Sequence, residues 1–467
     1  MEGGYFTFVS KLEKSIGIEV YATCSLGIGG IIKQCAEDFV VEEVLVDGSK
    51  AKADFSSTPI QENVLGSSSI LKRYLLCVMV KRNWDTLLAV KTVAQQLGIN
   101  VNRIQIAGIK DAKAVTAQHV TIENVTVDDI SKVNVKDIRI RPVGYFRTKI
   151  SPYFLQGNSF NVTVRGINHS KSTIEKRVRE TVEELKKIGG MPNFFGHQRF
   201  GTTRPITHHV GKALAKGDFK KAVMLFLAKP SVFEHVESRQ ERQELRATQD
   251  FEKALRNFPK QLRYERLMLK RLTENPKDYL GAFKMLPKKL QRLFVQAYQA
   301  YLFNKFLSRR VKSGLSLNKA EVGDYVLNVE RGGLPMPRMH KTVNEQNISE
   351  ISKAISEGRM RLALPLIGYK QFASHGFQGE IEKQILEEEN IFPENFKINN
   401  VPEVSSRGEL RTATTPLNDF KLVEILNDST SLSKNQIKTS FKLHRGCYAT
   451  VFLRELMKPR NPIKAGF

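Results

Sequence analysis

The strongest constraint on the fold is a change in the spacing of hydrophobic residues, which is strand-like towards both ends of the chain and helical in the middle. Residues 138–141 and 160–164 alternate between apolar and polar side chains, as half-buried strands do. From about residue 217 apolar residues recur at the spacing of a helix face, and the strand pattern returns after Val401. The mostly helical block is therefore a candidate inserted domain.

Individual elements can also be predicted. Residues 74–80 are a dense apolar run, which indicates a buried strand, and residues 86–97 have helical spacing with Asp85 available as the cap. Residues 174–188 place apolar side chains on one helix face. We further expect a serine-rich loop at 48–68, a charged helix at 238–258, a long amphipathic helix at 286–311, a loop at 330–345, a helix at 348–364, helix and loop at 376–393, and a flexible tail at 458–462.

The composition is that of a globular protein with a large excess of basic residues. The 467 residues suffice for two or three domains. There are 73 lysine and arginine residues against 48 aspartate and glutamate residues, which gives a net charge of +25 at pH 7. A surplus of that size favours a polyanionic partner, nucleic acid first. The alternative is a basic surface that only keeps the protein soluble.

The sequence lacks the patterns that are typical of disulfide-rich, metal-binding, secreted and membrane proteins. The four cysteines include no CxxC pair and are interpreted as reduced intracellular thiols. His208 and His209 are adjacent and would point apart on a strand, so we assign no metal. No signal peptide is evident, and no run approaches the ~18 apolar residues of a membrane span. We expect a cytoplasmic protein with no membrane partner.

One acidic side chain, Asp111, stands between Lys110 and Lys113 in the stretch 107–118. Strand-like residues flank this stretch, and Gly108 permits a tight turn. Nearby cations keep a carboxylate ionised, and an ionised aspartate can act as a nucleophile or a base. The alternative is a surface aspartate that only pairs with a lysine.

The stretch 193–201 combines three phenylalanines with amide and guanidinium groups between glycines. In an RNA-binding protein this mixture suits stacking on an unpaired base while its edges are hydrogen-bonded. The alternative is that the phenylalanines are ordinary core residues. The flanking glycines and the scarcity of aliphatic residues favour the functional interpretation.

Four separated stretches, in order along nearly the whole chain, together resemble the TruD family of pseudouridine synthases. Residues 30–43 resemble the family's first motif, 107–118 its catalytic GxKDxxAxTxQ motif, 193–201 its NxFGxQRFG motif, and 446–456 its C-terminal helix region. In addition, residues 297–304 fit its inserted domain, and the charged segment 235–285 resembles the longer archaeal and eukaryotic members.

The resemblance implies a mixed α/β (α+β) fold. A pseudouridine synthase catalytic domain with a mixed or antiparallel sheet would comprise residues 1–218 and 406–467. The family's helix-rich TRUD domain would interrupt it at residues 219–405.

The resemblance also implies an activity: isomerisation of a uridine, most often uridine-13 in this family, to pseudouridine in tRNA or another RNA. It implies no metal and no cofactor, and we expect a monomer. By carry-over, Asp111 is the catalytic nucleophile, Lys33 pairs with it, and Phe195 stacks on the target base. The other residues carried over as substrate-binding or pocket-shaping are Asn193, Gln118, Lys110 and Arg199.

Two other functions remain open on the sequence. A non-catalytic RNA-binding or RNA-folding protein needs only the basic charge and the aromatic residues. A hydrolase of N-glycosidic bonds would use an aspartate similarly but release the base. Within the isomerase reading, Asp111 could attack the nucleoside covalently or remove a sugar proton to give a glycal-like intermediate.

Overall fold

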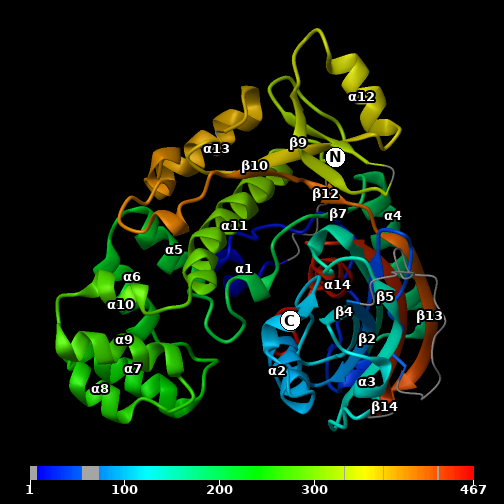
Figure 1. Cartoon of the computed structure of the whole chain (residues 1–467). Helices are drawn as coiled ribbons and strands as arrows, with labels where there is room; N and C mark the ends of the chain where they lie inside the picture. Colours follow the sequence, from blue (N-terminus) through cyan, green and yellow to red (C-terminus); the bar gives the residue numbers. More distant parts are fainter. Residues whose placement is uncertain (1–7, 55–72, 331, 372, 429–430) are drawn as a thin grey trace. The chain divides into compact units, whose positions relative to one another are not determined.

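The computed structural model describes residues 8–54, 73–330, 332–371, 373–428 and 431–467 (Figure 1). The chain forms two compact units. Unit 1 comprises Met1–Ala22, Pro192–Glu330 and Pro335–Thr414, and unit 2 comprises Thr23–Met191, Arg331–Leu334 and Thr415–Phe467. The expected insert, residues 219–405, therefore lies within unit 1 apart from Arg331–Leu334. Most of the serine-rich segment predicted as a loop, from residue 55 onward, lies outside the described residues.

Unit 2 is built on an eight-stranded sheet with the order β13-β14-β6-β1-β4-β2-β5, and β3 pairs with β4. Among the described pairings β1 and β4 run parallel and the others antiparallel, which confirms the mixed sheet. The strands are β1 (Phe39–Leu45), β2 (Tyr74–Arg82), β3 (Ile104–Ile106), β4 (Val115–Glu123), β5 (Ile138–Phe146), β6 (Leu155–Ile167), β13 (Asn418–Asp428) and β14 (Ser431–His444).

Two helices of unit 2, α2 and α4, follow the predicted patterns. In α2 (Thr86–Gln96) the Asp85 side chain accepts hydrogen bonds from the N–H groups of Leu87 and Leu88, as expected of the cap. Its buried face packs on residues of β2 and β4. In α4 (Lys171–Lys187) the predicted apolar face is buried. The shorter helices are α3 (Val127–Ser131) and α14 (Ala449–Met457).

The basic tail after α14 is packed against unit 2, so the prediction of a flexible tail was wrong. Lys458 Nζ donates to the carbonyl oxygens of Thr23, at 2.8 Å, and Ser25. Farther along, the carbonyl of Ala465 accepts from the N–H of Ile32 at 3.0 Å. Composition could not reveal these contacts because their partners lie more than 400 residues away in sequence.

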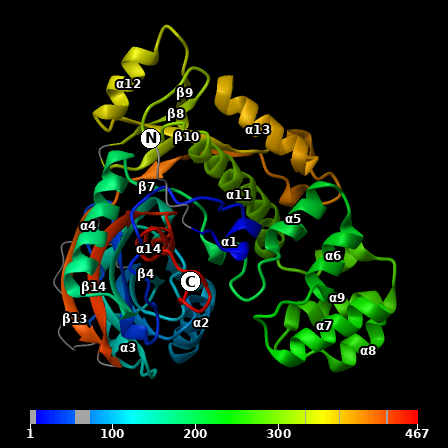
Figure 2. The ribbon, with the colours of Figure 1, turned by 180° about the vertical axis from the view of Figure 1, so that it is seen from behind.

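Unit 1 is largely helical, and its longest helix is α11 (Lys288–Lys312). This helix confirms the long amphipathic element and packs against α5 (Figures 1 and 2). The other helices are α1 (Lys11–Ser15), α5 (Thr207–Ala215), α6 (Phe219–Ala228), α7 (Val236–Thr248), α8 (Phe251–Asn257), α9 (Arg263–Glu274), α10 (Tyr279–Lys284), α12 (Ile348–Ser356) and α13 (Gly376–Glu389).

Two predictions in this unit need correction at α5 and α7. His208 and His209 lie on α5 rather than on a strand, and their ring centroids are 4.0 Å apart. The charged segment predicted as one helix is divided between α7 and α8. Gln249 adopts a left-handed conformation between them, with φ 53°, and Asp250 caps α8.

Unit 1 also holds a four-stranded sheet, which the sequence pattern did not predict. Its order is β11-β10-β8-β9, with β8 (Tyr325–Val329), β9 (Pro335–Thr342), β10 (Met360–Leu366) and β11 (Glu409–Thr412). The prediction of a loop at residues 330–345 was wrong for β9, which is an edge strand, where its prolines are tolerated. The predicted helix 348–364 ends at Ser356, and its second half is β10, since short apolar runs suit either element.

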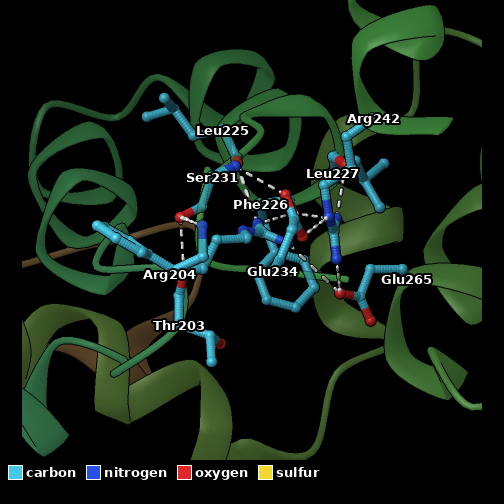
Figure 3. A network of polar contacts seen from close by, with 10 residues as sticks. Thr203, Arg204, Leu225, Phe226, Leu227, Ser231, Glu234, Arg242 and Glu265 are labelled. Carbon is cyan, nitrogen blue, oxygen red and sulfur yellow. Dashed lines mark hydrogen bonds and ion pairs between the residues drawn. The ribbon is translucent and has the colours of Figure 1, made fainter. Parts of the chain in front are cut away.

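The charged helices of unit 1 are joined by a buried network of ion pairs and hydrogen bonds (Figure 3). Arg242 Nε lies 3.0 Å from Glu234 Oε2, and Arg242 Nη2 lies 2.6 Å from Glu265 Oε1. Arg242 also donates to the carbonyls of Phe226 and Leu227. One guanidinium on α7 thus connects α6, α9 and the segment between α6 and α7.

Separately, the strands β7 (Met191–Pro192) and β12 (Thr414–Thr415) form a two-stranded sheet. In the described part of the chain, no helix is long and apolar enough to cross a membrane.

Candidate active site

The side chains of Asp111 and Lys33 form an ion pair in unit 2. Lys33 Nζ lies 2.9 Å from Asp111 Oδ1, and the two side chains are 10% and 21% exposed. Asp111 stands on the loop between β3 and β4, whereas Lys33 lies shortly before β1 and 78 residues before Asp111 in the chain. Since β1 and β4 are parallel neighbours in the sheet, the fold brings these two loops together.

Lys33 is held in an unusual backbone conformation, with φ 57°. A non-glycine residue seldom adopts this left-handed conformation unless its surroundings impose it. Ile31 exchanges backbone hydrogen bonds with Arg165 on one side of Lys33, and Cys35 N–H donates to Asp38 Oδ2 on the other. The ammonium also lies 4.2 Å from the centroid of the Phe39 ring. The lysine is therefore positioned by backbone, aromatic and ionic contacts at once.

A close approach of two segments explains Gly30 beside this lysine. Gly30 has φ 90°, and a Cβ there would lie 2.6 Å from Val164 Cγ1 and 2.8 Å from the carbonyl oxygen of Arg165. A side chain would push the Lys33 segment away from β6.

Buried side chains hold the main chain of the Asp111 loop at three positions. Gln118 Nε2 donates to the carbonyl of Gly108 at 3.1 Å. Thr86 Oγ1 accepts from the N–H of Lys110 and donates to its carbonyl, both at 3.1 Å. Lys81 Nζ donates to the carbonyl of Asp111 at 2.6 Å. Since Thr86, Gln118 and Lys81 are all fully buried, the backbone of the loop is held by side chains from the interior of unit 2.

Lys110 points into the interior of the unit, although the resemblance gave it a substrate-binding role. Its Nζ lies 2.8 Å from Glu43 Oε1, and Glu43 Oε2 accepts from the N–H of His119 at 2.8 Å. Burial alone would raise the pKa of Glu43, but Lys110 and His119 outweigh it and place that pKa below its ordinary range. In this structure Lys110 anchors the loop, and its role with substrate stays a prediction.

Lys81, Thr86 and Glu43 support the candidate site but were not identified from the sequence. Lys81 also donates to the carbonyl of Trp84 at 2.7 Å. Burial lowers the pKa of its ammonium to about 8, even though Asp111 acts in the opposite direction. One signal was available, because Lys81 continues the buried apolar run of β2, where a lysine needs internal partners.

The remaining candidate residues lie together in unit 1. Phe195 is 6% exposed, and Asn304 Oδ1 accepts from its N–H at 2.8 Å while Asn304 Nδ2 donates to its carbonyl at 3.0 Å. The ring of Phe303 meets the Phe195 ring edge to face, with centroids 5.6 Å apart. The Phe195 backbone is thus fixed from α11.

An arginine that the sequence analysis did not select, Arg411, connects the aromatic and amide residues. Its guanidinium lies 4.1 Å from the Phe195 centroid, and Arg199 lies at 5.3 Å from the same ring. Arg411 Nη2 also donates to Asn193 Oδ1 at 2.5 Å, and Asn193 Nδ2 donates to Thr412. Arg411 belongs to β11, more than 200 residues from the motif, so no local pattern pointed to it.

A cavity of about 330 Å³ opens beside Phe195. It is lined by polar and cationic groups that could hydrogen-bond the edges of a base or hold a phosphate. Its lining consists of Phe195, Arg199, Gln296, Gln299, Leu366, Ser406, Arg407, Gly408, Glu409 and Arg411.

The two sets of residues can perform different chemical tasks. In unit 2 a largely buried carboxylate with a lysine partner can attack an electrophilic carbon or accept a proton. In unit 1 an aromatic ring, guanidinium groups and amides can contact a base and its backbone. Among the described residues, no group of three or more histidine, cysteine or acidic side chains could hold a metal ion.

Comparisons with known proteins agree on one family. The family model described as tRNA pseudouridine synthase D (TruD) matches residues 15–456. A "Probable tRNA pseudouridine synthase D" of Methanosarcina acetivorans is 37% identical over 450 residues, which cover 96% of this chain and 97% of the relative. A relative of the same name from Pyrococcus abyssi is 36% identical over 440 residues, which cover 94% of this chain and 98% of the relative. The crystal structure of the "Putative tRNA pseudouridine synthase D (TruD)" from Methanosarcina mazei superposes with a TM-score of 0.80 at 36% identity, covering 98% of this chain and 99% of the other.

Proposed function

Because the chain belongs to the TruD family of tRNA pseudouridine synthases, we propose that it isomerises a uridine of tRNA to pseudouridine with Asp111 as the reacting carboxylate. The single observation that carries this assignment is the largely buried ion pair between Asp111 and Lys33, at 2.9 Å. A carboxylate removed from water would tend to take up a proton, and the lysine favours the ionised form that the chemistry needs.

The reaction breaks the N1–C1′ bond, turns the uracil and joins its C5 to C1′, while C5 loses a proton and N1 gains one. Asp111 could attack the nucleoside and later leave, or it could remove a proton from the sugar and return it. Either route requires the carboxylate to keep one orientation through both bond changes. The contacts of Lys81 and Thr86 with the loop backbone support that requirement.

Phe195 and its neighbours are proposed to receive the base. A uridine within a helix is out of reach, so it must be turned out of the stack, at a cost of a few kcal/mol. A phenyl ring with Arg199, Arg411 and Asn193 beside it provides the stacking and polar contacts that hold such a base. By the family resemblance, the proposed target is uridine-13 of the tRNA.

The activity is tested with tRNA transcripts that carry tritium at C5 of uracil. Isomerisation releases tritium to water, and digestion of the product RNA should give pseudouridine with no free uracil. Free uracil would instead indicate a hydrolase. Absence of both tritium release and free uracil from every tRNA of a cellular pool would leave only an RNA-binding or RNA-folding function.

The position of the target is tested by mapping pseudouridines in RNA from cells with and without this protein. A signal lost at uridine-13 alone would support the family assignment of the site. A signal lost at another position would still support an isomerase but would show that its target is a different uridine.

A further inference from the structure

A second cavity, of about 510 Å³, lies at the surface of α6 and the end of α7 in unit 1. It shares no residue with the cavity beside Phe195 or with the Asp111 loop. Its volume is within the range of about 300–1,000 Å³ usual for small-ligand pockets. The lining consists of Asp218, Lys220, Lys221, Met224, Leu225, Ala228, Lys229, Arg246 and Gln249.

The lining of this α6–α7 pocket combines apolar and cationic side chains. Met224, Leu225 and Ala228 are buried or half-buried and provide an apolar surface. The four cations are Lys220, Lys221, Lys229 and Arg246. A pocket of this composition suits a ligand that is partly apolar and carries a negative charge.

Its positive charge has no carboxylate partner within the described part of the chain. None of the four cations forms an ion pair there, and the one acidic lining residue, Asp218, uses Oδ1 to accept from the N–H of Lys221 at 2.8 Å. Lys229 is half-buried, and burial together with the charges of Arg204 and Arg246 lowers its pKa. An anion would relieve this repulsion.

Other cations of these helices do have acidic partners, as the network in Figure 3 shows. Arg242 meets both Glu234 and Glu265, and Arg204 Nη1 lies 3.7 Å from Glu265 Oε1. The same helical layer therefore neutralises its interior arginines, whereas the pocket cations have no carboxylate partner among the described residues and Lys220 lies 5.9 Å from the centroid of the Tyr279 ring. The unmatched charge is concentrated where the surface is hollow.

We propose that the α6–α7 pocket binds one nucleotide of the tRNA strand, with Lys229 and Arg246 on its phosphate and Met224 and Leu225 against its ribose or base. The identity of the RNA rests on the proposed function, whereas the site rests on the pocket itself. Lysine and arginine contacts to phosphate release counterions and provide affinity without sequence preference. The pocket would thus strengthen binding of the tRNA and leave the chemical step unchanged.

The proposal is tested with the double variant Lys229→Gln/Arg246→Gln of the full chain. Binding of a fluorescent tRNA transcript is followed by anisotropy over a range of KCl concentrations. We expect affinity to fall by about 3- to 10-fold and the slope of log K against log salt to decrease by about 1, as expected for one lost phosphate contact. Tritium release at saturating tRNA should keep the wild-type kcat.

The matched control is Lys270→Gln/Lys277→Gln, which removes the same charge from exposed positions outside the pocket. Equal losses of affinity in the two double variants, or no loss in either, would overturn the proposal. Thermal unfolding identifies any variant that misfolds, in which case Arg246→Gln alone, at an exposed position, is compared with Lys270→Gln.

A small anion is distinguished from an RNA strand by titrating inorganic phosphate and uridine monophosphate into the wild type. Weak competition with tRNA, abolished by the pocket variant, supports the strand. Tight binding of either small molecule with no change in tRNA affinity in the variant overturns it. Because anisotropy measures binding alone, it tests the pocket even if no tritium is released.

Discussion

The Asp111 loop of unit 2 and the helices α6–α9 of unit 1 both carry many cations, but they place the partners of those cations differently. In the loop, Lys33 meets Asp111, Lys110 meets Glu43, and Lys81 meets main-chain carbonyls. In the helices, Arg242 is neutralised inside the layer, whereas the pocket cations form no ion pair with any residue that the structure describes. Cations that have partners inside the protein hold a fixed geometry. Surface cations that form no ion pair can instead bind an external anion.

The largest expected effect is on the reacting carboxylate. Asp111→Asn keeps the shape of the side chain but removes its charge, so turnover should fall by about 10²–10⁴-fold or more. Tritium release measures the turnover, and anisotropy should show tRNA affinity close to wild type. A variant that keeps most of its turnover would remove Asp111 from the chemistry.

Removal of an internal partner in the helices should act on stability instead. Arg242→Met leaves Glu234 buried without its cation and leaves Glu265 only the longer contact with Arg204, at 3.7 Å, so it should cost about 3–5 kcal/mol of unfolding free energy. Urea unfolding, with hydrogen exchange of α7–α9, measures the loss. The control Arg256→Met breaks the exposed pair with Glu252 and should change little. Similar shifts in both would mean that burial of the network contributes nothing.

A smaller effect on the reaction rate is expected when Lys81 no longer supports the Asp111 loop. Lys81→Met removes the donor to the Asp111 carbonyl, and the resulting misplacement should lower kcat by about 10²-fold with little change in KM. The matched control is Lys458→Met, because Lys458 also donates to two carbonyls in unit 2 but not to the loop. Equal loss of kcat in the two variants would make the role of Lys81 one of general stability.

The pH dependence should show the smallest effect, again through Lys81. Its pKa is lowered from 10.5 to about 8, so wild-type kcat should fall as pH rises through about 8 and the donor loses its charge. Stability should change in the opposite direction: between these two values the unfolded chain binds more protons, and the free energy of unfolding rises with pH. Rate profiles and urea titrations measure the two trends. Lys81→Met should lack both, and a variant that keeps them would assign them to another group.

The sequence predicted the strands and helices whose patterns are regular and whose caps are local. The buried strand at 74–80 and the Asp85-capped helix are found as β2 and α2. It failed at β9 and β10, where the edge position of one strand and the burial of the other depend on neighbours far away in the chain. The same distance hid Arg411 and the packing of the C-terminal tail.

By itself the sequence determined the family, the mixed α/β class and the candidate residues, because motifs and hydrophobic periodicity are properties of short segments. The family resemblance predicted that Lys33 pairs with Asp111, and the structure has the two groups 2.9 Å apart. Only the tertiary structure decided that Lys110 turns inward to Glu43 and that Lys81 supports the loop. Those contacts depend on which strands are neighbours and on how deeply each ammonium is buried. Pairing and burial arise from the whole fold, so no single segment encodes them.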